Sequence, residues 1–122
     1  RTVYNGDGDA VMCPLLQQHQ TELIELCRRY NVTRMEVFGS AADARFNEQR
    51  SDLDFLVEFG NVPLNQRFDN FFELQRSLAE LFGRPIDLIE PGGMKNPYFI
   101  RRVNESRKLI YGADPQKYLY DI

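Results

Sequence analysis

Hydrophobic residues are spaced along this chain in two ways, and together they predict a domain that mixes helices and strands. In three segments they recur every three or four residues, as on the buried face of a helix, and in three others they form short runs, as in strands. We predict helices over residues 14–30, 65–82 and 97–111, with a short helical turn after Gly39-Ser40. We predict strands over residues 33–38, 52–59 and 86–89. This order indicates an α+β fold (a two-layer α/β arrangement), in which a small mixed sheet of about three or more strands packs against about four helices.

The second long helix is predicted to bury an aromatic face. Its apolar residues at helical spacing are Phe68, Phe71, Phe72, Leu78 and Phe82. Such a stripe is far more often part of a hydrophobic core than of a cofactor site. We therefore assign it to the core.

The histidine and the cysteines give weak functional signals. His19, the only histidine, lies on the apolar stripe of the first helix, and we interpret it as a core or boundary residue rather than a catalytic base. Cys13 and Cys27 are separated by about 20 Å if both are helical, too far for a disulfide. We predict two reduced thiols.

Length and charge limit the class of protein. The 122 residues suffice for one domain with a two-layer core. A hydrophobic content of 43% and a charged content of 27% are typical of soluble globular proteins, and no run approaches the ~20 apolar residues of a membrane span. The net charge of −3 argues against an extended nucleic-acid-binding groove. Without a signal-peptide pattern, we expect a cytoplasmic protein.

The two ends of the chain differ from its centre. Residues 1–12 show no periodicity, and we expect them to be flexible or foreign to the natural protein, whereas residues 13–111 form the domain. The tail, residues 112–122, carries Tyr118, Leu119, Tyr120 and Ile122. It is interpreted either as an interface with a partner or a second copy, or as a segment that packs back on the domain.

Two carboxylates stand side by side at the start of the second predicted strand. Asp52 and Asp54 are two residues apart, so they project from the same face of a strand, while Phe55 and Val57 point to the opposite, buried face. Adjacent carboxylates raise each other's pKa unless a cation lies between them, and Mg2+ prefers carboxylate oxygens. Taken alone, the pair is more often a solvated strand edge with two ordinary acids.

A glycine-serine pair upstream favours the functional interpretation. Gly39 and Ser40 lie where a strand turns into a helix. Glycine lets a phosphate approach the backbone closely, and the free N–H groups at the start of a helix favour an anion. Asp87, placed mid-strand between two apolar residues, supplies a third acid if it lies on the same face as Asp52 and Asp54.

These residues resemble a known family. The pattern of Gly-Ser followed by S-D-x-D and an apolar run is similar to nucleotidyltransferases of the DNA polymerase beta type, and most to the minimal nucleotidyltransferases (MNT), MntA-like antitoxins encoded beside HEPN-type toxins. The segment 82–91 resembles the family's third strand and residues 96–111 its closing helix. The resemblance covers roughly residues 15–111 and implies a polymerase beta-like palm.

The resemblance also implies roles for individual residues. It assigns catalysis and two Mg2+ ions to Asp52, Asp54 and Asp87. It assigns nucleotide binding to Gly39, Ser40, Arg45 and Ser51. Many relatives carry an A-R-G step after the Gly-Ser pair, whereas this chain has Ala41-Ala42-Asp43-Ala44-Arg45. Arg45 either replaces that arginine from a shifted position or is a solvated loop charge, and the same question applies to Arg50.

The acceptor of the transferred nucleotide does not follow from the motif. The resemblance implies transfer of AMP from ATP, or of another nucleoside monophosphate, to a hydroxyl of a HEPN-type toxin. One alternative is a non-catalytic antitoxin that neutralises its partner by docking. Another is a nucleotidyltransferase for a small, aminoglycoside-like molecule, which would need an acceptor-binding domain that this length does not provide. Self-association is left open.

The last predicted helix is basic. Its cations, with one just ahead of it, are Lys95, Arg101, Arg102, Arg107 and Lys108. They are interpreted as a solvated face, as a charge clamp near the triphosphate, or as a docking surface for an acidic partner.

Overall fold

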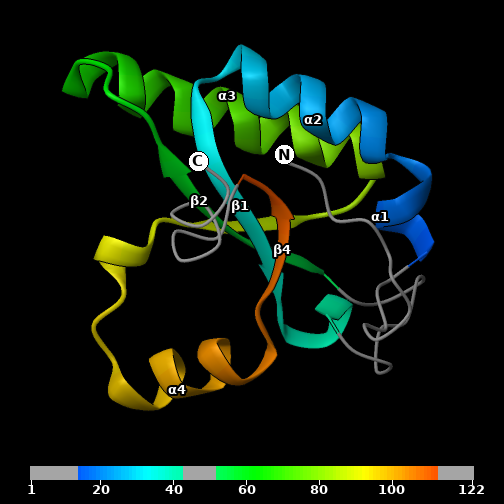
Figure 1. Ribbon diagram of the computed structural model, residues 1–122, viewed down its shortest axis with the longest axis vertical. Coiled ribbons are helices and arrows are strands. Elements are labelled where there is room, and N and C mark those ends of the chain that lie inside the picture. The colour runs from blue at the N-terminus through cyan, green and yellow to red at the C-terminus, as the bar shows by residue number, and fades with distance from the viewer. Residues whose placement is uncertain (1–13, 43–51, 113–122) are drawn as a thin grey trace, which may run out of the picture.

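The computed structural model describes residues 14–42 and 52–112, which form one sheet with helices on both of its faces (Figure 1). The helices are α1 (Pro14–Gln18), α2 (Gln20–Arg29), α3 (Leu64–Phe82) and α4 (Pro97–Ser106). The strands are β1 (Val32–Phe38), β2 (Leu53–Phe59), β3 (Ile86–Ile89) and β4 (Lys108–Tyr111). Two short 3-10 turns are η1 (Gly39–Ala42) and η2 (Pro91–Gly93).

The sheet is mixed, as predicted. Its strand order is β3-β2-β1-β4. Strand β1 is antiparallel to both β2 and β4, whereas β2 is parallel to β3. A parallel pair needs a crossover of a dozen or more residues, and α3 with its flanking loops supplies that crossover. The α+β class and the mixed sheet are confirmed.

Side chains of β2 alternate between the two faces of the sheet. Phe55 and Val57 are fully buried in the main core, which α2 and α3 cover, and truncation of such a phenylalanine to alanine costs about 3–5 kcal/mol. Leu56 packs on the other face with Phe38 and with Val103 of α4. Asp54, two residues before Leu56, therefore lies on the face that α4 partly covers.

The first predicted helix is two helices that meet at His19. In one continuous helix the N–H of His19 would donate to the carbonyl of Leu15. That carbonyl instead accepts a hydrogen bond from the His19 ring (Nδ1 to O, 3.0 Å), and the N–H of His19 donates to Leu16 (3.3 Å). The ring lies edge-on to Phe82, with centroids 5.2 Å apart. His19 is half-buried at the boundary of the core, and the helix break follows from its side-chain hydrogen bond.

The predicted closing helix over residues 97–111 is wrong in its last third. The helix ends at Ser106, and Arg107 has an extended backbone (φ −63°, ψ 140°). Residues Lys108–Tyr111 form β4, which pairs with the open edge of β1. A short apolar run fits a helix or a strand equally well from spacing alone. This segment is a strand because pairing with the edge of β1 satisfies its backbone N–H and C=O groups.

The predicted buried stripe of α3 is also partly wrong. Phe68 and Phe72 are 62% and 51% exposed, and the buried residues are Leu74, Leu78 and Phe82. At about 100° per residue, Phe72 lies about 160° around the helix from Leu74, on the side away from the core. Phe68 and Phe72 pack edge-on against each other (4.8 Å between centroids) instead.

Cys27 is a free, fully buried thiol. Burial raises its pKa to about 12, so it stays neutral at physiological pH. Cys13 lies outside the described residues. In the two described ranges, no helix combines the length and the apolar character needed to cross a membrane.

Candidate active site

Asp54 and Asp87 lie opposite each other on the parallel strands β2 and β3. Residues in register on neighbouring strands project from the same face, so Asp87 is on the side of Asp54. Asp52 is exposed and precedes β2 by one residue. The register thus places Asp87 on the face of Asp54, as the three-acid hypothesis requires of that pair, whereas Asp52 lies outside the strand.

The Asp54 carboxyl is in an unfavourable electrostatic environment. Burial, then the charge of Asp87 and then that of Asp52, raise its pKa to about 6. Within residues 14–42 and 52–112, no arginine, lysine or histidine forms an ion pair with Asp54. Among the described residues, Asp54 therefore has no ion-pair partner that would offset this repulsion.

Gly39 is held against Asp54. Its φ is +73°, a conformation that residues with side chains rarely adopt. A Cβ at this position would lie 2.6 Å from Oδ2 of Asp54. The N–H of Gly39 donates to the hydroxyl of Ser106 (2.9 Å), the last residue of α4. Glycine is thus required both by the backbone and by the approach of a carboxylate.

The acids open into a pocket of about 360 Å³ between the sheet and α4. Its described lining comes from Phe38, Gly39, Asp54 and Asp87 on the sheet side and from Phe99, Arg102, Val103, Glu105 and Ser106 on α4. Three of these side chains are acids and one is an arginine. The pocket combines an apolar wall with an excess of negative charge, which suits a cation that carries an anionic ligand.

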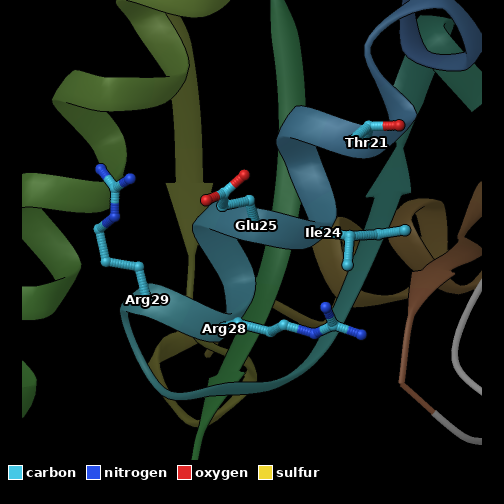
Figure 2. Close-up of a pocket in the computed structure, with 5 residues that line it drawn as sticks. All are labelled: Thr21, Ile24, Glu25, Arg28 and Arg29. Atoms are coloured by element: carbon cyan, nitrogen blue, oxygen red, sulfur yellow. The ribbon is translucent and has the colours of Figure 1, made fainter.

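A larger hollow of about 620 Å³ lies along α2 (Figure 2). Its described lining residues are Thr21, Ile24, Glu25, Arg28 and Arg29. Figure 2 shows that Arg28 and Arg29 point in different directions, so their charges do not converge on one ligand. We therefore place the active site at the smaller pocket, where the side chains meet.

The family follows from comparison with known proteins. The family model described as "Polymerase beta, Nucleotidyltransferase" matches residues 21–116, most of the chain. The chain belongs to the polymerase beta nucleotidyltransferase family. It is a nucleotidyltransferase, and the pocket with Asp54 and Asp87 lies inside the matched region.

Three relatives of this nucleotidyltransferase illustrate the range of similarity. "Putative protein adenylyltransferase MJ0128" of Methanocaldococcus jannaschii is 39% identical over 99 residues, 80% of this chain and 90% of that protein. A solved structure titled "Structure of putative minimal nucleotidyltransferase" is 26% identical, with a TM-score of 0.63 over 83% of this chain and 98% of that chain. A chain from the complex of tri-AMPylated Shewanella oneidensis HEPN toxin with MNT antitoxin is 21% identical, with a TM-score of 0.57 over 85% of this chain and 78% of that one. The last similarity bears on the fold alone.

The acids of this nucleotidyltransferase fit a divalent cation by their chemistry. In the described part of the chain, no three His, Cys, Asp or Glu side chains form a ready-made ligand cluster for a metal. Mg2+ does not need such a cluster, because it is usually bound by one or two carboxylates, substrate phosphates and water. The adjacent Asp54 and Asp87, whose negative charges repel each other, match that mode of binding.

The structure places some of the predicted site residues together, and others lie outside its described part. The structure brings together Gly39, Asp54 and Asp87 at one pocket and places Asp52 beside it in sequence. Ser40 follows Gly39 in η1, and its side chain lies outside the described part. Arg45, Arg50 and Ser51 also lie outside the described residues.

The nucleotidyltransferase pocket contains residues that the sequence did not single out. Ser106 bonds to Gly39, and nothing in its sequence context distinguishes it from other serines. Phe38 and Phe99 line the apolar wall and pack edge-on, 6.0 Å apart. Of the basic residues near the C-terminal end, Arg102 lines the pocket. The charge-clamp interpretation therefore applies to Arg102.

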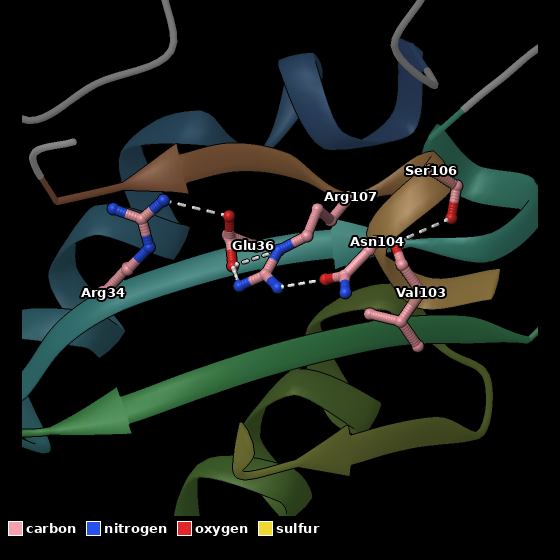
Figure 3. A network of polar contacts seen from close by, with 6 residues as sticks. All are labelled: Arg34, Glu36, Val103, Asn104, Ser106 and Arg107. Carbon is pink, nitrogen blue, oxygen red and sulfur yellow. Dashed lines mark hydrogen bonds and ion pairs between the residues drawn. The ribbon is translucent and has the colours of Figure 1, made fainter. Parts of the chain in front are cut away.

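Arg107 has a structural role instead. It donates to Glu36 from Nη2 (2.5 Å) and Nε (3.1 Å), and to Asn104 from Nη1 (2.6 Å), as Figure 3 shows. Glu36 is 5% exposed and also accepts from Arg34 (3.0 Å). Burial alone would raise the pKa of Glu36, but Arg107 and Arg34 together hold it below its ordinary value. Glu36 lies between apolar residues in β1, and this position was the sequence feature that could have predicted its ion pair with Arg107.

Proposed function

We propose that this nucleotidyltransferase transfers AMP from ATP to a hydroxyl of a HEPN-type toxin and thereby acts as its antitoxin. Mg2+ is the proposed cofactor, bound by Asp52, Asp54 and Asp87. The observation that carries the proposal is the register of Asp54 with Asp87 beside Gly39, which puts two mutually repelling carboxylates next to a turn suited to phosphate.

The reaction breaks one bond and forms one. The acceptor oxygen attacks the α-phosphorus of ATP, the bond from that phosphorus to the bridging oxygen breaks, and pyrophosphate leaves. Mg2+ bound at these acids would supply positive charge for the attacking and leaving oxygens of such a displacement.

The candidate site residues have different parts in this scheme. Asp52 and Asp54 would hold the cations, and Asp87 would complete the set and help to deprotonate the acceptor hydroxyl. The turn would hold the phosphates through the backbone N–H groups that follow Gly39 and through the Ser40 hydroxyl, since the N–H of Gly39 donates to Ser106. Because the acids stand on a sheet, they need little reordering when the ligand arrives.

The relatives support the choice of AMP and of a protein acceptor. The protein from Methanocaldococcus jannaschii has protein adenylyltransferase in its name. The Shewanella oneidensis complex contains a HEPN toxin that carries AMP groups.

The test is incubation of the protein with α-labelled ATP, Mg2+ and the product of the neighbouring toxin gene. The proposal predicts label on the toxin, none without Mg2+, and none with Asp54→Asn. A matched control is Glu58→Gln, which changes an exposed acid further along β2 and should leave labelling unchanged.

The same experiment separates the alternatives. A tight complex with the toxin and no label would favour an antitoxin that acts by docking alone. Label on an aminoglycoside-like molecule but not on the toxin would favour a small-molecule nucleotidyltransferase. Either result would overturn the proposed protein acceptor.

A further inference from the structure

The end of α4 is fixed to β1 at two points. Ser106 accepts a hydrogen bond from the N–H of Gly39 (2.9 Å), just after β1. Its neighbour Arg107 donates to Glu36 inside β1, as Figure 3 shows. Ser106 thus attaches the end of α4 to the turn after β1, and Arg107 attaches it to β1 itself.

The first of these contacts reaches the active site directly. Gly39 lies so close to Asp54 that a Cβ at residue 39 would be 2.6 Å from the carboxylate. Asp54 therefore limits the turn on one side, and the hydroxyl of Ser106 holds its N–H on the other. Ser106 itself is oriented by carbonyl groups of its own helix, those of Arg102 (3.3 Å) and Val103 (3.5 Å).

We propose that Ser106 is a positioning residue for nucleotide binding, acting through Gly39 to set the distance between the phosphate-binding turn and the metal-binding acids. This inference rests on the proposed function and deepens it. Loss of the hydroxyl leaves the peptide between Phe38 and Gly39 free to rotate. The next N–H groups of η1, which would hold the phosphates, rotate with it.

The test compares Ser106→Ala with two further variants. Ser106→Thr keeps a hydroxyl at the same position, and Asn104→Ala removes a different hydrogen bond at the end of the same helix, the one to Arg107. The readouts are the Kd for the ATP analogue AMP-PNP with Mg2+, measured without the toxin so that no AMP can be transferred to it, kcat for AMP transfer at saturating ATP, and the melting temperature.

We expect Ser106→Ala to weaken AMP-PNP binding about fivefold to tenfold and to lower kcat by a further ten- to hundredfold, since a displacement of about 1 Å can cost 10²-fold in rate. Ser106→Thr restores both values to within about threefold, and Asn104→Ala changes neither. A merely structural role would reduce the folded fraction and leave the Kd of the folded protein unchanged. Wild-type affinity and kcat in Ser106→Ala, or equal losses in Asn104→Ala, would overturn the inference.

The binding measurement also separates this inference from the proposed function. If the wild-type protein binds AMP-PNP but transfers no AMP to the toxin, the proposed transfer fails, and the Kd of Ser106→Ala still supports or overturns the positioning role. If the wild-type protein does not bind AMP-PNP at all, both are overturned.

Discussion

The carboxylate of Asp54 occupies the space that a side chain at residue 39 would need. The distance from an ideal Cβ on Gly39 to Oδ2 of Asp54 is 2.6 Å, well inside van der Waals contact. The turn and the acid therefore constrain each other's position. A change at either one is expected to disturb both the phosphate and the metal ends of the site.

Gly39→Ala is predicted to lose activity beyond what its loss of stability explains. The positive φ alone costs roughly 1–2 kcal/mol for a non-glycine residue. The added methyl also displaces the Asp54 carboxylate, so we expect transfer to fall about 10²-fold. Rates of AMP transfer and thermal unfolding measure the two effects.

Gly83→Ala is the matched control for this substitution. Gly83 has φ +65°, close to the value at Gly39, but its Cβ would meet nothing within 4 Å. We expect a similar loss of stability and full activity. Equal activity losses in the two variants would contradict the steric role of Asp54.

Asp54→Asn is predicted to abolish transfer and to stabilise the metal-free protein. The amide cannot replace the carboxylate as a cation ligand, but it removes a half-buried charge that Asp87 and Asp52 repel. The melting temperature without Mg2+ should rise by a few degrees, and added Mg2+ should no longer raise it. A variant that folds and keeps near-wild-type transfer would remove Asp54 from the mechanism.

The metal-free protein is predicted to lose stability as the pH rises from about 4 to about 6. The pKa of Asp54 is about 6 in the folded protein against an ordinary value of 3.8, so the folded state binds more protons in that interval. The stabilisation that comes from protonated Asp54 is fully present below its ordinary pKa of 3.8 and is lost above its folded-state pKa of about 6. Denaturant unfolding of the wild type and of Asp54→Asn across this range measures it, and identical pH dependence would contradict the assignment.

Arg102→Ala is predicted to raise the KM for ATP. Arg102 lines the pocket opposite Asp54 and Asp87 and is placed to bind a phosphate. A hydrogen bond to a charged group contributes about 1.5–3 kcal/mol, so we expect KM to rise on the order of tenfold. Arg101, its exposed neighbour on α4, does not line the pocket, and Arg101→Ala should behave as wild type. The same KM in both variants would leave no role for Arg102 in binding.

The positions of two candidate site residues could be predicted from the sequence because they obey short-range rules. Asp54 lies on the face opposite Phe55 because strand residues alternate, and Gly39 lies at a turn that only glycine fits well. Asp87 was informative because it is a polar residue in an apolar strand. Its pairing with Asp54 still required the parallel register, which spacing along the chain cannot give.

The errors in the sequence-based predictions arise where long-range contacts decide the structure. The segment after Ser106 is a strand because the edge of β1 is free, and no local pattern reports that edge. Phe68 and Phe72 were assigned to the core by spacing alone, but the core-facing side of α3 runs through Leu74 and Leu78. The contact of Ser106 with Gly39 joins residues 67 positions apart and leaves no trace in either local sequence.

The most direct measurement of the central claim is the anomalous X-ray scattering of crystals grown with Mn2+ and AMP-PNP. The proposed site predicts two manganese peaks roughly 3.5–4 Å apart, both in contact with carboxylate oxygens from the group Asp52, Asp54 and Asp87 and with the phosphates at the Gly39 turn. Manganese bound elsewhere, or nucleotide bound with no metal at these acids, would contradict it.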